Sequence, residues 1–226
     1  MKKLVSFALL TLALVFSLAI FGGCVSTGGL RSVRGRGDRE LNIIDATGFT
    51  GISINGGTFD MVFNQSPDFS VELYIQDNLF RHVDTEVSGS MLHINSDRSF
   101  NTVSGETPRL TINAPSLNHF NVSGAVNANM VLDTSTLNID VQGAANIVLE
   151  GTANELSISA SGAANVSAFD LIAQYVTVVL NGAGNVDVYA SETLDARLNG
   201  VGRIRHDGNA EVTRRVAGLG TISPRR

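Results

Sequence analysis

Apolar and polar residues alternate along most of the chain beyond residue 40, and this alternation predicts β-strands. Ile52-Ser53-Ile54, Leu92-His93-Ile94 and Leu110-Thr111-Ile112 are short examples in which every second position differs in polarity. A period of two places successive side chains on opposite faces of a strand, so one face is buried and the other meets water. We therefore predict an almost all-β protein, with one short helical turn at Asp77–Phe80.

A repeat of 18 to 20 residues runs through the second half of the chain. A glycine anchors each copy, and successive anchors are 19, 19, 20, 18 and 18 residues apart. Apolar residues recur two positions before the glycine and four positions after it. A short fixed period is typical of a solenoid, in which each coil buries its apolar side chains by stacking on the next. We predict a parallel β-helix (β-solenoid) with about 18–20 residues per coil and a less regular N-terminal part. The anchors are Gly124, Gly143, Gly162, Gly182, Gly200 and Gly218.

The anchor glycines and a column of asparagines three positions later each have a structural interpretation. Glycine is expected where a corner has positive φ or where adjacent coils approach closely. Asparagine tolerates left-handed backbone and bonds its own turn, and stacked amides bond from coil to coil. We favour such a structural ladder over a row of amides that binds a polysaccharide. The asparagines are Asn127, Asn146, Asn165 and Asn185, and Arg203 takes the same position in the next coil.

The start of the chain predicts export and a lipid anchor. Two lysines precede an apolar run that ends in Ile20-Phe21-Gly22-Gly23-Cys24, the order of a secretory signal. Cys24 is the only cysteine, lies where a signal peptidase would cut, and completes a stretch that resembles a bacterial lipobox. We expect acyl chains on Cys24 to hold the protein to a lipid bilayer. A retained transmembrane helix is the alternative.

These observations divide the chain into segments. We predict a signal peptide over residues 1–23, then the lipidated cysteine with a flexible Arg-, Gly- and Ser-rich linker over 24–40. Residues 41–226 form a single β-helical domain. Within it, 41–116 are irregular N-terminal coils or a cap, and 117–222 are the regular coils.

Charge is distributed unevenly along this domain. Residues 41–196 contain 3 Arg and 17 acidic residues, whereas residues 197–226 contain 7 Arg and 2 acidic residues. The acidic body argues against nucleic acid as a partner, because phosphates require a positive surface. The basic end either prevents edge-to-edge stacking of an open solenoid or binds an anionic glycan or a partner protein. The candidate residues are Arg197, Arg203, Arg205, Arg214 and Arg215.

The sequence contains few features that indicate catalysis or metal binding. It contains no HExxH, GxSxG or Walker A motif, and with a single thiol it cannot form a cysteine-based zinc cluster. Parallel β-helices often carry polysaccharide lyases or hydrolases, which need clustered carboxylates or an arginine base. Asp140 and Arg197 share a column but stand three coils, about 14 Å, apart. We predict no catalytic residues, no metal and no cofactor; a carbohydrate-active enzyme is the alternative.

The order of the motifs resembles a known bacterial family. The motifs are Gly51-Ile-Ser-Ile-Asn-Gly56, Val71-Glu-Leu73, the stretch Val83–Ile94, Ala114-Pro-Ser-Leu117 and the Gly-Ala-x-Asn series. Over residues 43–222 they resemble the putative auto-transporter adhesin, head GIN domain family. The resemblance implies a right-handed parallel β-helical fold, often on a lipoprotein.

Together these features predict a non-catalytic lipoprotein that is exported and lipid-anchored at the cell envelope. We expect it to serve as a binding, adhesion or structural module whose partner is a glycan or an envelope protein. A third hypothesis is a scaffold that assembles into oligomers through the ends of the solenoid.

Overall fold

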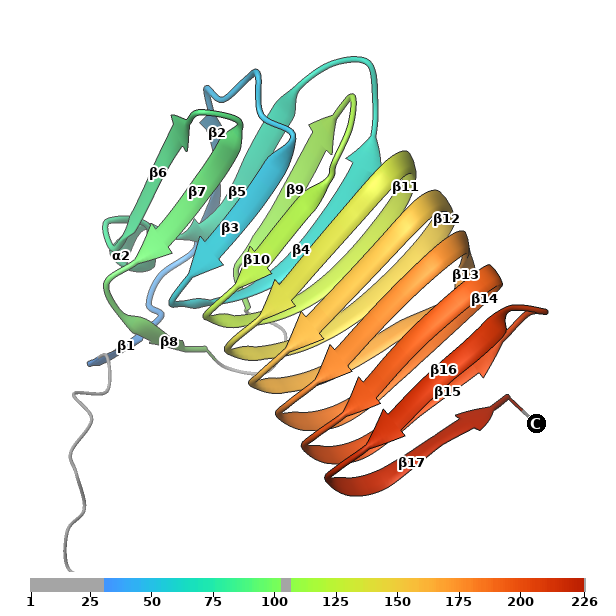
Figure 1. Ribbon diagram of the computed structural model, residues 1–226. Coiled ribbons are helices and arrows are strands. Elements are labelled where there is room, and N and C mark those ends of the chain that lie inside the picture. Colours follow the sequence, from blue (N-terminus) through green and yellow to red (C-terminus); the bar gives the residue numbers. More distant parts are fainter. Residues whose placement is uncertain (1–30, 103–106, 226) are drawn as a thin grey trace, which may run out of the picture. The chain divides into compact units, whose positions relative to one another are not determined.

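Four of the regular coils are each a single long strand that bends once, and a glycine corner separates each strand from the next (Figure 1). The structure, a computed structural model, describes residues 31–102 and 107–225; the predicted signal peptide and Cys24 lie outside the described residues. The long strands are β11 (Ala125–Val141), β12 (Ala144–Ala160), β13 (Ala163–Leu180) and β14 (Ala183–Leu198). After them come β15 (Val201–Asp207), β16 (Glu211–Val216) and β17 (Leu219–Pro224). The predicted all-β, parallel β-helical fold is confirmed.

Neighbouring coils pair in parallel and keep the sequence repeat in register. Ala125, Ala144, Ala163 and Ala183 are successive partners, and the same holds along the rest of each strand. The bend divides every coil into a segment before it, such as residues 125–132, and a segment after it. We call the sheet of segments before the bend the first face and the sheet after it the second face. Apolar side chains from both faces fill the space between them.

The N-terminal part extends both faces with shorter strands. On the first face the order is β2-β5-β9-β4-β11, and on the second face it is β6-β7-β3-β10-β11. The elements are β1 (Ser32–Arg34), β2 (Arg39–Ile44), β3 (Gly51–Asn55), β4 (Thr58–Gln65), β5 (Ser70–Gln76), α2 (Asp77–Phe80), β6 (Val83–Ser88), β7 (Met91–Ser96), β8 (Ser99–Asn101), β9 (Arg109–Ala114) and β10 (His119–Val122). The short helical turn at α2 is as predicted. Strand β1 and the start of β2 lie inside the stretch predicted to be a linker.

One coil lies out of chain order. Strands β3 and β4 form a coil whose neighbours on one side are β7 and β9, and on the other side β10 and β11. The chain therefore leaves this coil, builds the outer end of the solenoid, and returns past it to start the regular coils. Because the pairing is not between consecutive segments, it leaves no sequence period, which is why residues 41–116 read only as irregular.

Antiparallel strands and large side chains close the N-terminal end. Strand β5 is antiparallel to β9, β2 to β5, and β6 to β7. The largest fully buried side chains gather in this part of the chain, whereas many interior positions of the regular coils hold alanine or valine. In the part of the chain that the structure describes, no helix has the length and apolar character needed to cross a membrane.

Close approach between coils explains the anchor glycines. We predicted either a positive φ or close approach of adjacent coils at these glycines. None of the six has a positive φ, so the first reason does not apply. A Cβ atom built on Gly162 would instead overlap the carbonyl oxygen of Gly143, and one on Gly200 would overlap that of Gly182. The same oxygen of Gly143 accepts a hydrogen bond from the amide of Ala163 at 2.9 Å. The corners therefore stack backbone on backbone, with no room for a side chain.

Candidate functional site

A groove follows the outer surface where the long strands bend. Two adjoining hollows of about 410 and 510 Å³ share Asp133 and Thr152 and together extend from Asn64 on β4 to Ser191 on β14. We call this feature the bend groove. Its lining residues are Asn64, Gln65, Val131, Leu132, Asp133, Thr134, Ser135, Gly151, Thr152, Ala153, Asn154, Ile172, Gln174 and Ser191.

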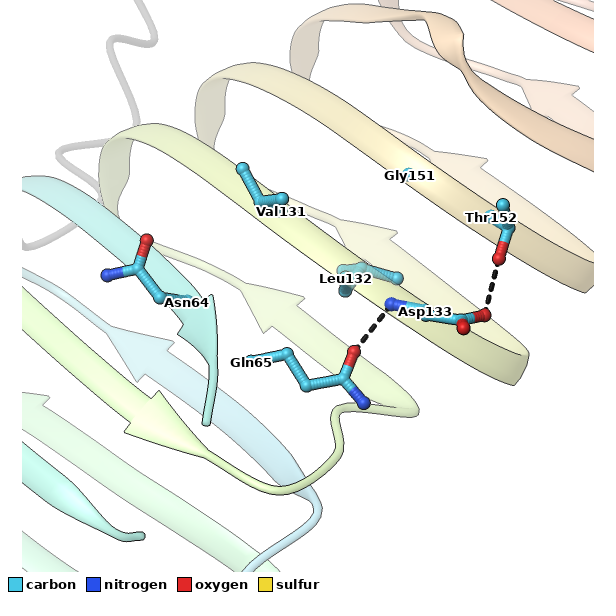
Figure 2. A pocket seen from close by; sticks show the side chains of 7 residues that line it. All are labelled: Asn64, Gln65, Val131, Leu132, Asp133, Gly151 and Thr152. Atoms are coloured by element: carbon cyan, nitrogen blue, oxygen red, sulfur yellow. Dashed lines mark hydrogen bonds between the residues drawn. The ribbon is translucent and has the colours of Figure 1, made fainter. Parts of the chain in front are cut away.

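Local hydrogen bonds fix the part of the groove drawn in Figure 2. The Oε1 atom of Gln65 accepts from the backbone amide of Asp133 at 2.5 Å, and Thr152 Oγ1 donates to the Asp133 carboxylate. Gly151 has a φ of +117° and lies against the carbonyl oxygen of Leu132, where a Cβ atom would overlap it. Glycine therefore lets the two coils approach closely at this point of the lining, while Asp133 is held by the coils on either side.

The chemistry of the lining is that of a binding surface. Most of its polar groups are hydroxyls and amides, and they alternate with apolar side chains such as Val131, 51% exposed, and Ile172, 46% exposed. Asp133 is the one carboxylate in the lining. Hydrolysis or lyase chemistry would require a second carboxylate or a base within reach of the same substrate atom. Among residues 31–102 and 107–225, no three His, Cys, Asp or Glu side chains gather as a metal site would require.

The predicted asparagine column is a continuous chain of hydrogen bonds. Asn185 donates to Asn165 at 3.1 Å, Asn165 to Asn146 at 3.1 Å, and Asn146 to Asn127 at 2.9 Å. Asn127 donates in turn to Asp60 on β4 at 2.8 Å. Because a carboxylate can only accept, Asp60 sets the direction of every amide in the ladder.

The ladder differs from the sequence interpretation in two respects. Its asparagines lie within strands, and among the described residues only glycines have a positive φ, so the asparagines do not adopt a left-handed backbone. Asp60 was missed because it is not an asparagine and precedes Asn127 by 67 residues. The ladder amides that bond to each other are those of Asn127, Asn146, Asn165 and Asn185.

A second polar column lies immediately before the anchor glycines. Asn55 donates to Asn95 at 2.8 Å and accepts from Ser123 Oγ at 2.8 Å, and Asn199 donates to Asn181 at 2.8 Å. The sequence held a signal for it, because the position before each of the first five glycines is Ser, Gln or Asn. This second column thus links coils at the two ends of the solenoid, whereas the asparagine ladder runs continuously on the first face.

The basic residues near the C-terminus do not form a single surface. Arg197 and Arg215 are neighbours on the second face, whereas Arg203 and Arg205 lie on the first face. Arg214 is the register partner of the buried Ala196 and so belongs to an inner row. Arg197 is paired with Asp195 at 2.5 Å.

The guanidinium of Arg205 contacts Asp187 and Phe169 of the same molecule. Its Nε donates to Asp187 at 2.7 Å, and this hydrogen bond, with the charge of Asp187, raises the pKa of the Arg205 guanidinium above its ordinary value. The guanidinium carbons of Arg205 and Arg225 lie 5.3 and 4.4 Å from the centre of the Phe169 ring. Phe169 lies at a β-bulge, where the register of β13 shifts relative to both neighbouring strands. The one extra residue relative to β12 explains the single spacing of 20.

Comparisons with known proteins agree with this architecture. The sequence model of a family described as "Putative auto-transporter adhesin, head GIN domain" matches residues 48–210. The fold is similar to the crystal structure of a putative adhesin from Bacteroides fragilis, with a TM-score of 0.69 and 23% identity over 85% of this chain and 99% of that one. A putative adhesin from Parabacteroides merdae gives a TM-score of 0.53 and 20% identity over 87% and 100% of the two chains. No curated protein sequence matches the chain significantly.

Proposed function

Because the chain belongs to the putative auto-transporter adhesin, head GIN domain family, we propose that it is an exported binding module that attaches to a linear glycan along the bend groove. The observation that carries this proposal is the groove itself, a hollow that crosses successive coils and is lined by hydroxyls, amides and exposed apolar side chains. Sugars present the matching chemistry, since their hydroxyls hydrogen-bond to such groups while their C–H faces pack on apolar side chains.

The shape of the groove suits an extended polymer. Coils of a β-solenoid follow each other at about 4.8 Å, so a chain lying across them meets an equivalent row of side chains at each step. Asp133, Thr152 and Ile172 are such successive groove positions, each on a different long strand.

Charge favours a neutral polymer over an acidic one. Glu150 on β12 is the register partner of Asp170 on β13, and both are exposed beside the Asp133 carboxylate of the groove wall. Like charges so close to a bound polyanion oppose its binding. The preferred ligand is therefore an uncharged polysaccharide rather than the anionic glycan considered for the basic end.

A glycan array tests this proposal. We would probe it with the chain from residue 24 onward, carrying Cys24→Ala so that no lipid is attached. Binding should be confined to neutral linear glycans and should fall about tenfold or more in Ile172→Ala/Gln174→Ala, which removes one apolar and one amide contact. Thr177→Ala, an exposed change on the same strand but on the second face, should leave binding intact. Equal binding by both variants would exclude the groove.

We also propose that acyl chains on Cys24 hold this module to the bilayer. The sequence supports the anchor through the lipobox-like stretch that ends in this sole cysteine. In a bacterial host supplied with radiolabelled palmitate, the full-length chain should incorporate the label, and Cys24→Ala should not. A full-length chain that stays unlabelled would refute the anchor without affecting the glycan proposal.

A further inference from the structure

The two ends of the solenoid carry strands with one unpaired edge. Among the described residues, β17 on the first face pairs only with β15, and β16 on the second face pairs only with β14. At the other end, β2 pairs only with β5 and β6 only with β7. We propose that the C-terminal end of one molecule stacks on the N-terminal end of a second copy, so that β17 meets β2 and β16 meets β6. This inference is independent of the glycan proposal.

On the first face, the end strands β17 and β2 both carry exposed apolar side chains. Leu219 of β17 is 76% exposed on the outer surface of its end. On β2, Leu41 is 56% and Ile43 78% exposed, and both lie on the outer side, where Leu41 is the partner of the partly exposed Tyr74. Stacking the ends would place these leucine and isoleucine side chains on one surface and remove apolar area from water.

On the second face, the end strands β16 and β6 carry opposite charges. The outer side of β16 presents Arg215, whose register partner on β14 is Arg197. Asp84 and Glu86 are exposed on β6, the strand that would face it. Two like ends would repel each other, whereas opposite ends attract, so the charge pattern selects head-to-tail stacking.

The inner rows also end in charged or titratable side chains, and the charged ones lie on different faces at the two ends. At the C-terminal end, Arg214 continues the row of buried Ala196, and His206 continues the row of buried Val188. At the N-terminal end, Glu40 continues the row of buried Ile75. Each end thus replaces a core side chain by a charged or titratable one, basic at the C-terminal end and acidic at the N-terminal end.

The directions of the strands allow β17 to pair with β2 and β16 to pair with β6. Strand β2 is antiparallel to β5, which is antiparallel to β9, so β2 runs in the direction of the first-face strands and would pair with β17 in parallel. Strand β6 is antiparallel to β7 and would pair with β16 antiparallel. Both are ordinary sheet arrangements. Because the contact joins surfaces at opposite ends of the solenoid, each added copy leaves a free end, and the assembly grows as a linear filament.

Sedimentation velocity over a range of protein concentrations tests the stacking. The Cys24→Ala chain from residue 24 onward should form a concentration-dependent series of species, weakened by added salt. Reversing the charge of one end, with Arg214→Glu/Arg215→Glu or with Asp84→Arg/Glu86→Arg, should weaken association by roughly tenfold or more. Asp140→Arg/Glu155→Arg, a charge change of equal size on exposed side chains in the middle of the second face, should not.

A mixing experiment identifies the ends in contact. Each end-reversed variant carries two like ends and should stay monomeric alone, but an equimolar mixture of the two should associate, because every contact then joins opposite charges. Circular dichroism would establish that both variants are folded. A wild-type chain that stays monomeric at all concentrations, or a mixture that fails to associate, would overturn the proposal.

Discussion

Replacing Gly162 by alanine tests whether coil-to-coil approach is what requires the repeated glycine. The Cβ atom of the new side chain would lie 2.5 Å from the carbonyl oxygen of Gln142 and 2.7 Å from its carbonyl carbon, and closer still to the oxygen of Gly143. Ordinary contact begins at 3.4 Å. All three atoms belong to backbone, so no side chain can rotate away, and the corner must open by roughly 1 Å to admit the methyl group.

The energy follows from the contacts that such an opening disturbs. Overpacking of this kind destabilises by about 1–3 kcal/mol, and the weakened Ala163-to-Gly143 hydrogen bond adds about 1 kcal/mol. Alanine also restricts the unfolded chain, which offsets about 0.4–1 kcal/mol. We therefore expect Gly162→Ala to lower the free energy of unfolding by roughly 2–3 kcal/mol.

Urea denaturation followed by circular dichroism measures this loss. The control is Gly89→Ala, at a glycine with a φ of +61° and no atom within 4 Å of the point where the new methyl group would lie. That variant suffers only backbone strain, about 1 kcal/mol. If Gly162→Ala is no more destabilising than Gly89→Ala, the close-approach argument is wrong.

Three further changes test contacts described above. Asn165→Ala removes two ladder hydrogen bonds at an exposed position and should cost about 1 kcal/mol in urea denaturation; Asn165→Gln, whose longer amide cannot keep the register, should not restore it. Phe169→Ala removes the ring beneath Arg225 and should speed hydrogen exchange in β17, by an amount that corresponds to roughly 1 kcal/mol, with β12 as the unaffected reference. Burial and then the charge of Arg214 lower the pKa of His206 below its usual 6.5. The unfolded chain therefore binds the proton more tightly, so stability should be full above pH 6.5 and decline as the pH falls through and below it; a His206→Gln variant that declines equally would contradict this.

The sequence predicted the regular coils because their information is local. Each anchor glycine and its apolar neighbours recur within 18–20 residues, so the coil length, the inner rows and the columns of register could be aligned by inspection. The asparagine ladder followed from the same alignment. Its terminal acceptor Asp60 did not, since β4 lies far upstream and carries no anchor of the repeat.

The bend groove could not be predicted from the sequence for a similar reason. Gln65 holds Asp133 across 68 residues, and nothing in either residue's surroundings marks the pairing. Gly151 reads as an ordinary loop glycine until the neighbouring coil is placed against it. The arginine-rich end shows the opposite limit. Its residues are close in sequence, but period-two alternation and the intervening bend place Arg214, Arg215 and Arg203 on different surfaces.

The out-of-order coil has a consequence for how the protein folds. Strand β4 pairs on one side with residues about 49 positions later and on the other with residues about 67 positions later, whereas the regular coils pair across 18–20 positions. Closing such long loops costs more conformational entropy than adding a coil to a finished edge, and it is therefore slower. During synthesis, β3 and β4 must wait for β11 before both their edges are covered. We therefore expect the coil of β3 and β4 to be completed only after β11 has formed, although its own residues are made first.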